Sequence, residues 1–333
     1  MLVLSQADVT RLLPMRDCIE LMAATLASLA RGEAVLPLRT VIRIPDSRDA
    51  FAVMPACLTN PRTIGAKIIT VFPGNHGTAL DSHQGAVLLF DSTNGSLAAL
   101  LDATAITTIR TAAVSAVATR TLARDDASTL AIVGAGVQGH AHLEAICAVR
   151  PIKALRVWSR DADHARKLAA VGRERFQLDT SVSPTTRDAV RDAAIVCTCT
   201  SATEPVLQGA WLSPGTHINA VGASTPNARE VDSALVAAAR LYADRRESAL
   251  KEPGDILVPL REGAITPDHI VGEIGDLLIG RAAGRRDDRE ITLFKSLGLA
   301  VEDLASASYV YDQAVRTGAG TRVELGGARR AAH

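Results

Sequence analysis

The 333-residue sequence has few aromatic side chains and no excess of charge of either sign. Aromatic residues make up 3% of the chain, and Lys plus Arg equals Asp plus Glu at 36 each, so the formal net charge is zero. A protein that binds nucleic acid needs a basic field for the phosphates and aromatic platforms for the bases. This composition disfavours a nucleic-acid-binding function, but it is compatible with a local basic site for a small anion.

Cysteine is also scarce, and the five cysteines form no C-x-x-C pair. An odd number of scattered thiols is typical of a reducing compartment. Cys197 and Cys199 lie in the apolar run AAIVCTCTSA, where small buried strand residues are favoured over a metal site, and we predict no metal. The N-terminal MLVLSQADVTRLLP lacks a basic n-region, and no run of about 20 apolar residues occurs. We therefore expect a cytoplasmic protein without a signal peptide or membrane contact.

The first third of the chain changes from a helical to a β-rich pattern. Residues 5–31 have helical apolar spacing, which predicts one or two helices ending at Gly32. Residues 36–102 then contain short β-rich runs separated by turn signals such as PDSRD and PGNHG, which predict an antiparallel or mixed sheet. A helix is expected next, from near Asp102 or Thr104 through ITTIRTAAVSAVATRTLA.

From STLAIVGAGVQG onward, apolar strand runs alternate with helical patterns. This alternation predicts an α/β fold, a parallel Rossmann sheet with helices on both faces. From Thr292 we expect one long amphipathic helix, and the final GGARRAAH shows no pattern of an ordered element.

The strongest motif is a glycine-rich turn between a predicted strand and a predicted helix. Gly134, Gly136 and Gly139 form G-A-G-V-Q-G directly after LAIV. In a dinucleotide-binding unit the first glycine permits the turn, the second admits the pyrophosphate and the third packs helix on strand. Exposed N–H groups at the helix start, around Val137 and Gln138, would bind the phosphates. We therefore predict a bound dinucleotide.

The end of the next strand indicates which dinucleotide is used. An NAD site usually places Asp or Glu there to bind the ribose hydroxyls, whereas this sequence has Ser159 followed by Arg160. A hydroxyl and a guanidinium suit a ribose phosphate, so we predict that NADPH is preferred and NADH possible. The alternative is that Arg160 pairs with Asp161 or Asp163 on the surface.

Two later strands are each followed by a loop of small residues. The loops contain Thr200 and Ser201 after IVCTC, and Val221 and Gly222 after THINA. Loops at the carboxyl ends of parallel strands converge on the ligand crevice. We expect these four residues to contact the cofactor and the nearby Ser224 to lie near the nicotinamide.

Three basic residues occur in apolar surroundings: Arg39, Lys67 and Arg110. A buried cation is costly unless it is paired, and no acidic residue adjoins Lys67 or Arg110 in the sequence. A substrate carboxylate would pair with them, with Arg giving a two-point grip and Lys a single donor. Structural ion pairs or snorkelling chains are the alternative for each residue.

Together these segments resemble the ornithine cyclodeaminase and mu-crystallin family, and its ketimine reductases most closely. The resemblance covers nearly the whole chain and rests on SHQG with AVLLFD, ITTIRTAAVSAVATR, IVGAGVQG, VWSR, INAVGAS and ITLFKSLGLAVEDLASA. It implies a homodimer with residues 1–117 and 305–333 as a mixed α+β substrate and dimerisation domain, and residues 118–304 as an inserted Rossmann domain. It also implies that Arg39, Lys67 and Arg110 bind the substrate carboxylate, with Met54 beside them.

Two departures from the cyclodeaminase pattern are informative. Ser224 aligns with a catalytic Asp of the cyclodeaminases, and Ala52 aligns with a Glu that precedes Met54-Pro55. Cyclodeamination needs acid–base chemistry that Ser and Ala cannot supply. Ser at this position matches the ketimine reductases, so ornithine cyclodeamination is disfavoured.

We therefore expect NAD(P)H-dependent reduction of a small cyclic 2-imino acid, such as pyrroline- or piperideine-2-carboxylate, to the amino acid. Lys67, Ser224 and His83 are the candidate catalytic residues, with His83 either relaying a proton or serving as a turn residue. The alternatives are an alanine-dehydrogenase-type enzyme, an ornithine cyclodeaminase, and a non-catalytic binding protein like mu-crystallin.

Overall fold

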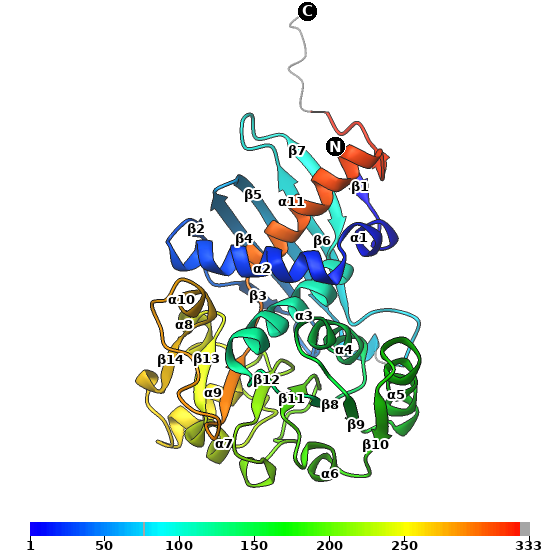
Figure 1. Ribbon diagram of the computed structural model, residues 1–333. Helices are drawn as coiled ribbons and strands as arrows, with labels where there is room; N and C mark the ends of the chain where they lie inside the picture. The colour runs from blue at the N-terminus through cyan, green and yellow to red at the C-terminus, as the bar shows by residue number, and fades with distance from the viewer. Residues whose placement is uncertain (76, 327–333) are drawn as a thin grey trace, which may run out of the picture. The chain divides into compact units, whose positions relative to one another are not determined.

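The computed structural model describes residues 1–75 and 77–326, which form two compact units (Figure 1). Unit 1 comprises Met1–Leu21, Gly32–Arg110 and the described residues from Leu299 onward. Unit 2 comprises Met22–Arg31 and Thr111–Gly298, so it interrupts unit 1 in the sequence. Of the final GGARRAAH, all residues after Gly326 lie outside the described part. The expected borders after residues 117 and 304 lie within helices, α3 (Ala103–Leu122) and α11 (Ala300–Thr317).

Unit 1 is built on a mixed sheet with the strand order β16-β1-β7-β6-β5-β4-β2, and β3 pairs with β4 beside β2. The β1–β7 pair is parallel and the other pairs are antiparallel, as the hairpin-like turn signals predict. The strands are β1 (Leu2–Leu4), β2 (Ala34–Val35), β3 (Thr40–Arg43), β4 (Ala50–Thr59), β5 (Arg62–Val71), β6 (His83–Phe90), β7 (Leu97–Asp102) and β16 (Thr321–Arg322).

Helix α11 packs on one face of this sheet, across β4, β5 and β6 (Figure 1). Alternate residues of β4 are buried, since successive strand residues point to opposite faces. The helix lies so close to β5 that a Cβ at Gly65 would overlap Leu304 of α11. The remaining elements of unit 1 are α1 (Gln6–Leu12), the start of α2 (Met15–Ala30), the start of α3 as far as Arg110, and the 3-10 turn η1 (Pro73–Asn75).

Unit 2 is built on an eight-stranded sheet in which every described pair is parallel. Its order is β10-β9-β8-β11-β12-β15-β13-β14, so the winding direction reverses between β8 and β11. This confirms the predicted Rossmann architecture. The strands are β8 (Thr129–Val133), β9 (Ala154–Trp158), β10 (Asp179–Val182), β11 (Ile195–Thr198), β12 (His217–Ala220), β13 (Arg240–Ala243), β14 (Ile270–Glu273) and β15 (Thr292–Lys295).

Both faces of this parallel sheet are buried. In β8, Leu130 and Ile132 join one apolar core, while Ala131 and Val133 join the other. Such double burial explains why the strands read as continuous apolar runs. The helices of unit 2 are the remainder of α2 and α3, with α4 (Val137–Val149), α5 (Ala162–Phe176), α6 (Thr186–Val190), α7 (Ser233–Ala238), α8 (Arg246–Ala249), α9 (Gly254–Arg261), α10 (Ile274–Leu278), η2 (Gly209–Trp211) and η3 (Pro267–His269).

The prediction of a single helix from Thr292 is wrong. Residues Thr292–Lys295 form strand β15, fully buried between β12 and β13. Gly298 then adopts a positive φ of 78°, and α11 begins only at Ala300. A short apolar run cannot be assigned to strand or helix by its periodicity alone, and here the pairing with two neighbouring strands decides.

Two further observations concern the chain as a whole. Within the described residues, no helix has the length and apolar character needed to cross a bilayer. All five cysteines are free thiols.

Candidate active site

The glycine-rich turn has the geometry of a dinucleotide-binding loop. Gly134 has a φ of 103°, a conformation that side chains rarely adopt, and its N–H donates to the carbonyl oxygen of Trp158 at 2.8 Å. A Cβ on Gly139 would overlap the carbonyl oxygen of Gly134. The first glycine therefore permits the turn, and the third allows α4 to pack directly on it.

The second glycine leaves the start of α4 open. Gly136 is the N-cap of α4 and gives it no side-chain cap, and a Cβ there would meet no atom within 4 Å. The next residue, Val137, is 56% exposed. The first N–H groups of a helix have no partner within the helix, and the positive end of the helix dipole attracts anions. The site therefore fits the pyrophosphate of a dinucleotide.

Helix α4 is fixed beneath this opening by a buried histidine. His142 Nδ1 lies 2.8 Å from the carbonyl oxygen of Gln138, and its Nε2 lies 2.9 Å from Ser115 Oγ. Burial lowers the pKa of His142 to about 4, so the imidazole is neutral at physiological pH. Nδ1–H then donates to Gln138, and Nε2 accepts from Ser115 of α3.

The two residues predicted to select the cofactor follow β9. Ser159 is half-buried, and Arg160 is exposed. The acids that could have paired with Arg160 are engaged elsewhere: Asp161 caps α5 by accepting from the N–H groups of Asp163 and His164, and Asp163 pairs with Arg166. No ion pair of Arg160 occurs among the described residues.

The predicted loop residues lie at the carboxyl ends of β11 and β12. Thr200 and Ser201 follow β11, and Val221 and Gly222 follow β12. Strands β11 and β12 are adjacent and parallel, and Val221 N donates to the carbonyl oxygen of Thr198 at 3.0 Å, so the two loops share one edge of the sheet. Ser224, further along the second loop, is exposed.

In unit 1, Lys67 and Arg110 are brought together by two adjacent acids of α11. Lys67 Nζ lies 2.6 Å from Asp303 Oδ2, and Arg110 Nε donates to Asp303 Oδ1 at 2.8 Å. Arg110 Nη1 also donates to Glu302 Oε2 at 2.9 Å. All four side chains are at most 4% exposed. No acidic residue adjoins Lys67 or Arg110 in the sequence, and their acidic partners come from α11, at least 192 residues later in the chain.

The electrostatics of this cluster are strongly coupled. Burial lowers the pKa of Lys67 to about 8, while the charge of Asp303 opposes this shift and those of Arg110 and Arg39 add to it. Burial alone would raise the pKa of Asp303, but the charges and hydrogen bonds of Arg110 and Lys67 bring it below its usual value. Asp303 is therefore ionised, and Lys67 is ready to lose a proton just above neutral pH.

Arg39 and Met54 complete this part of the site. Arg39 directly precedes β3 and is half-buried, and its charge is felt at Lys67. Met54 of β4 is the strand partner of Lys67 on β5 and is 4% exposed. Directly paired residues share one face of a sheet, so the thioether and the ammonium lie side by side.

His83 lies away from the cluster. It is exposed at the start of β6, where its Nδ1 lies 3.1 Å from Ser82 Oγ, and its strand partner is Val71. Lys67 pairs with Val87, four residues further along the same strand, which corresponds to roughly 13 Å. A catalytic role for His83 stays a prediction without support from this geometry.

The sequence interpretation overlooked two groups of buried charges. One is the Glu302-Asp303 pair, and the other is Glu230, Asp255 and Lys295 in unit 2. A signal for both existed, because Glu302-Asp303 and Lys295 interrupt apolar segments in the same way as Lys67 does.

Comparisons with known proteins agree with this arrangement. The family model described as the ornithine cyclodeaminase/mu-crystallin family matches residues 1–318. The chain is 42% identical over 292 residues to the ketimine reductase mu-crystallin of Mus musculus, covering 87% of this chain and 89% of that protein.

Two solved structures are similar over almost their full length. One is the Delta(1)-pyrroline-2-carboxylate reductase of Thermococcus litoralis in complex with NADH and L-proline, with a TM-score of 0.95, 38% identity and coverage of 97% of this chain and 100% of that one. The other is an archaeal alanine dehydrogenase dimer with bound NAD, with a TM-score of 0.92, 30% identity and coverage of 98% and 99%. Sequence, fold and site geometry agree, and the chain belongs to the ornithine cyclodeaminase/mu-crystallin family.

Proposed function

We propose that this protein is an NAD(P)H-dependent oxidoreductase that reduces a small cyclic 2-imino acid, such as pyrroline- or piperideine-2-carboxylate, to the L-amino acid. The observation that carries the proposal is the gathering of cations in the unit 1 cluster. Lys67 and Arg110 meet at Asp303 of α11, and the charge of Arg39 is felt at Lys67. A substrate carboxylate would bind among these three cations.

The individual side chains have distinct tasks in this scheme. Arg39 and Arg110 hold the carboxylate, since a guanidinium offers planar, paired donors and a permanent charge. Lys67 adds a third donor, and Met54 gives the ring an apolar contact. Asp303 keeps Lys67 charged and fixed in place. Ser224, exposed after β12, is the candidate partner for the imine nitrogen.

The open start of α4 and the loops after β11 and β12 would hold the nicotinamide dinucleotide. The cofactor, when bound, supplies the hydride, and the protein contributes orientation and charge. We propose a preference for NADPH over NADH, because Arg160 has no ion pair among the described residues while Asp161 and Asp163 are engaged in α5. Its guanidinium is available for a 2′-phosphate.

We also propose a homodimer formed through unit 1. Strand β3 carries Ile42, which is 57% exposed and pairs with Phe51 of β4. Beside it, β4, β5 and β6 line a hollow of about 370 Å³ that includes Phe51, Ile68 and Leu88. Exposed apolar side chains gathered on one surface are typical of interfaces. The similar archaeal alanine dehydrogenase is a dimer.

The reducing compartment predicted from the sequence is supported by the five free thiols, and we keep the cytoplasm as the proposed location.

The test is oxidation of NADPH and NADH by the purified protein with pyrroline- and piperideine-2-carboxylate. Rapid turnover of a cyclic imine would establish the proposal. Turnover of pyruvate with ammonia, but not of cyclic imines, would favour an amino-acid dehydrogenase. Conversion of ornithine without net change in NAD(P)H would identify a cyclodeaminase, and ligand binding without turnover would identify a binding protein.

A further inference from the structure

Glu230 is a fully buried carboxylate that joins the two loops at the carboxyl edge of the unit 2 sheet. Its Oε1 accepts from the N–H and the hydroxyl of Thr200 at 2.6 and 2.8 Å. Its Oε2 accepts from Thr198 Oγ1 at 2.8 Å and from the N–H of Gly222 at 2.6 Å. Each oxygen therefore accepts one hydrogen bond from a backbone N–H and one from a hydroxyl. In this way a single carboxylate connects the loops after β11 and β12.

Glu230 is itself held by a second layer of buried charge. Asp255 Oδ1 accepts from the N–H groups of Glu230 and Val231 at 2.7 and 3.1 Å. Asp255 Oδ2 pairs with Lys295 Nζ at 3.0 Å, and Lys295 also donates to the carbonyl oxygen of Ala220 at 3.1 Å. Asp255 and Lys295 are each 1% exposed. The geometry of the two loops is thus tied to β12 and β15 through hydrogen-bonded charges.

The position of this network distinguishes it from structural charge pairs elsewhere in the sheet. In an open parallel sheet, ligands bind outside the carboxyl ends of the strands, where the winding reverses. Here the winding reverses between β8 and β11. With the pyrophosphate at the start of α4 and the adenosine side at β9, the other half of a dinucleotide extends over β11 and β12.

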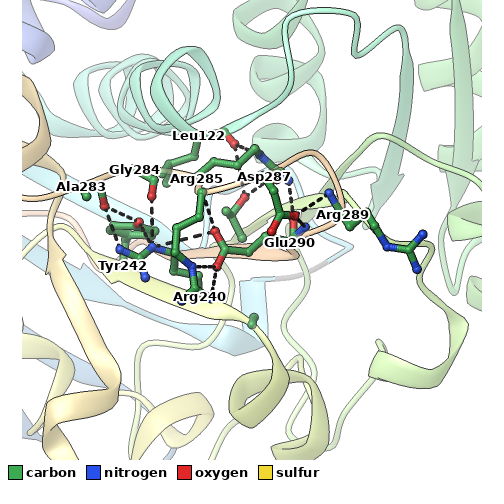
Figure 2. Close-up of polar contacts among 12 residues, drawn as sticks. Leu122, Arg240, Tyr242, Ala283, Gly284, Arg285, Asp287, Arg289 and Glu290 are labelled. Carbon is green, nitrogen blue, oxygen red and sulfur yellow. Dashed lines mark hydrogen bonds and ion pairs between the residues drawn. The ribbon is translucent and has the colours of Figure 1, made fainter.

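A polar network at the opposite edge of the same sheet provides a comparison (Figure 2). Glu290, just before β15, is 7% exposed, accepts from the N–H of Arg286 at 2.9 Å and pairs with its guanidinium at 2.6 Å. Nearby, Arg240 donates to Tyr242 Oη at 2.7 Å, and Arg285 donates to the carbonyl oxygen of Leu122 at 2.8 Å. These residues gather around the amino ends of β13 and β15, away from the carboxyl edge.

We propose that Glu230 is a positioning residue for the nicotinamide half of the cofactor: it locks the β11 and β12 loops into the one geometry that receives that half. The proposal rests on the proposed dinucleotide-dependent function. Glu230 acts through Thr200 and Gly222, since its own carboxylate is buried beneath them. Gly222 is held so closely that a Cβ there would overlap both the carbonyl oxygen of Thr200 and the Glu230 side chain.

The test is Glu230→Gln, which keeps the shape of the side chain. Both carboxylate oxygens accept a backbone N–H, so either orientation of the amide places an NH₂ group against an N–H donor. Titration calorimetry would measure the Kd of NADPH and of adenosine 2′,5′-bisphosphate, which lacks the nicotinamide half. NADH and ADP serve as the second pair of ligands.

We expect the Kd of the full cofactor to rise at least about tenfold, because binding must then order the loops that Glu230 otherwise holds, and one hydrogen bond to a charged group is worth at least that factor. The Kd of the adenosine ligand should stay within about twofold, which is small beside a tenfold effect. A variant that merely damages the fold would weaken both ligands together. Glu290→Gln, a buried carboxylate at the opposite edge, is the matched control and should leave both Kd values unchanged.

Thr198→Val is the second variant, used if Glu230→Gln does not fold. It removes one hydroxyl donor to Glu230 and should weaken the full cofactor selectively, by less than Glu230→Gln. Equal loss of both ligands, or no loss of either, would overturn the proposal. Wild-type protein that binds the cofactor but reduces no imine would contradict the proposed function and leave this comparison fully measurable.

Discussion

Lys67 can change its charge within the pH range of an enzyme assay, since burial lowers its pKa to about 8. The ammonium form binds a carboxylate and the neutral amine does not, so kcat/KM for the imino acid should fall as the pH rises through about 8. Lys67→Arg should move this decline to higher pH, because a guanidinium stays charged. Deprotonation of the substrate iminium would affect both proteins equally, so identical pH profiles would exclude this role for Lys67.

Asp303 of α11 raises the pKa of Lys67 through its negative charge. Asp303→Asn removes the charge that raises the Lys67 pKa, so the decline in kcat/KM should move to lower pH. Breaking a buried ion pair from one side should also lower the free energy of unfolding by about 3–5 kcal/mol. Urea denaturation and a pH–rate profile would measure the two effects. Asp312→Asn, on an exposed position of the same helix, should change neither.

Ser159 tests the cofactor preference at the level of one side chain. Ser159→Asp places a carboxylate where a 2′-phosphate would lie and where an NAD site binds the ribose hydroxyls. The ratio of kcat/KM for NADPH to that for NADH should fall at least about tenfold, equivalent to about 1.4 kcal/mol. An unchanged ratio would show that Ser159 does not contact this part of the cofactor.

At the scale of elements, two glycines at the junction of β8 with α4 should affect different properties, one cofactor affinity and the other the stability of the fold. Gly136→Ala adds a methyl group that meets no protein atom, so the free energy of unfolding should stay within about 0.5 kcal/mol while cofactor affinity falls. Gly139→Ala drives a methyl group into the Gly134 carbonyl and should cost about 1–3 kcal/mol of stability. Denaturant melts and calorimetric titration would test both, and equal stability loss in the two variants would contradict this division.

How much the sequence predicted also depends on the element. The turn at Gly134 was predictable because its three glycines, strand and helix lie within one short segment. The partners of Arg110 were not, since Asp303 lies 193 residues away and only packing of α11 on the sheet brings them together. Strand β15 was missed for the same reason: its identity is set by β12 and β13 on either side.

At the scale of the whole molecule, the proposed homodimer is the property to measure. Ile42→Asp places a charge on the exposed apolar strand β3 and should convert a dimer into a monomer, because an unpaired charge in an apolar interface is costly. Light scattering over a range of concentrations would report the mass. A dimer that persists in Ile42→Asp, with Lys251→Asp on exposed unit 2 surface as the control, would place the interface elsewhere.

The helix that supplies Glu302 and Asp303 leaves the ribosome after nearly everything it packs against. Until residue 303 emerges, Lys67 and Arg110 lack the acidic partner that allows their charges to be buried. The face of the sheet on which α11 packs is exposed to water until then. Unit 2, apart from its short α2 segment, is translated as one continuous stretch and ends at Gly298, before that helix begins. Domains generally fold as units during synthesis. The Rossmann unit can therefore fold before α11 has been synthesised, and the ion pairs of Lys67 and Arg110 with that helix form only afterwards.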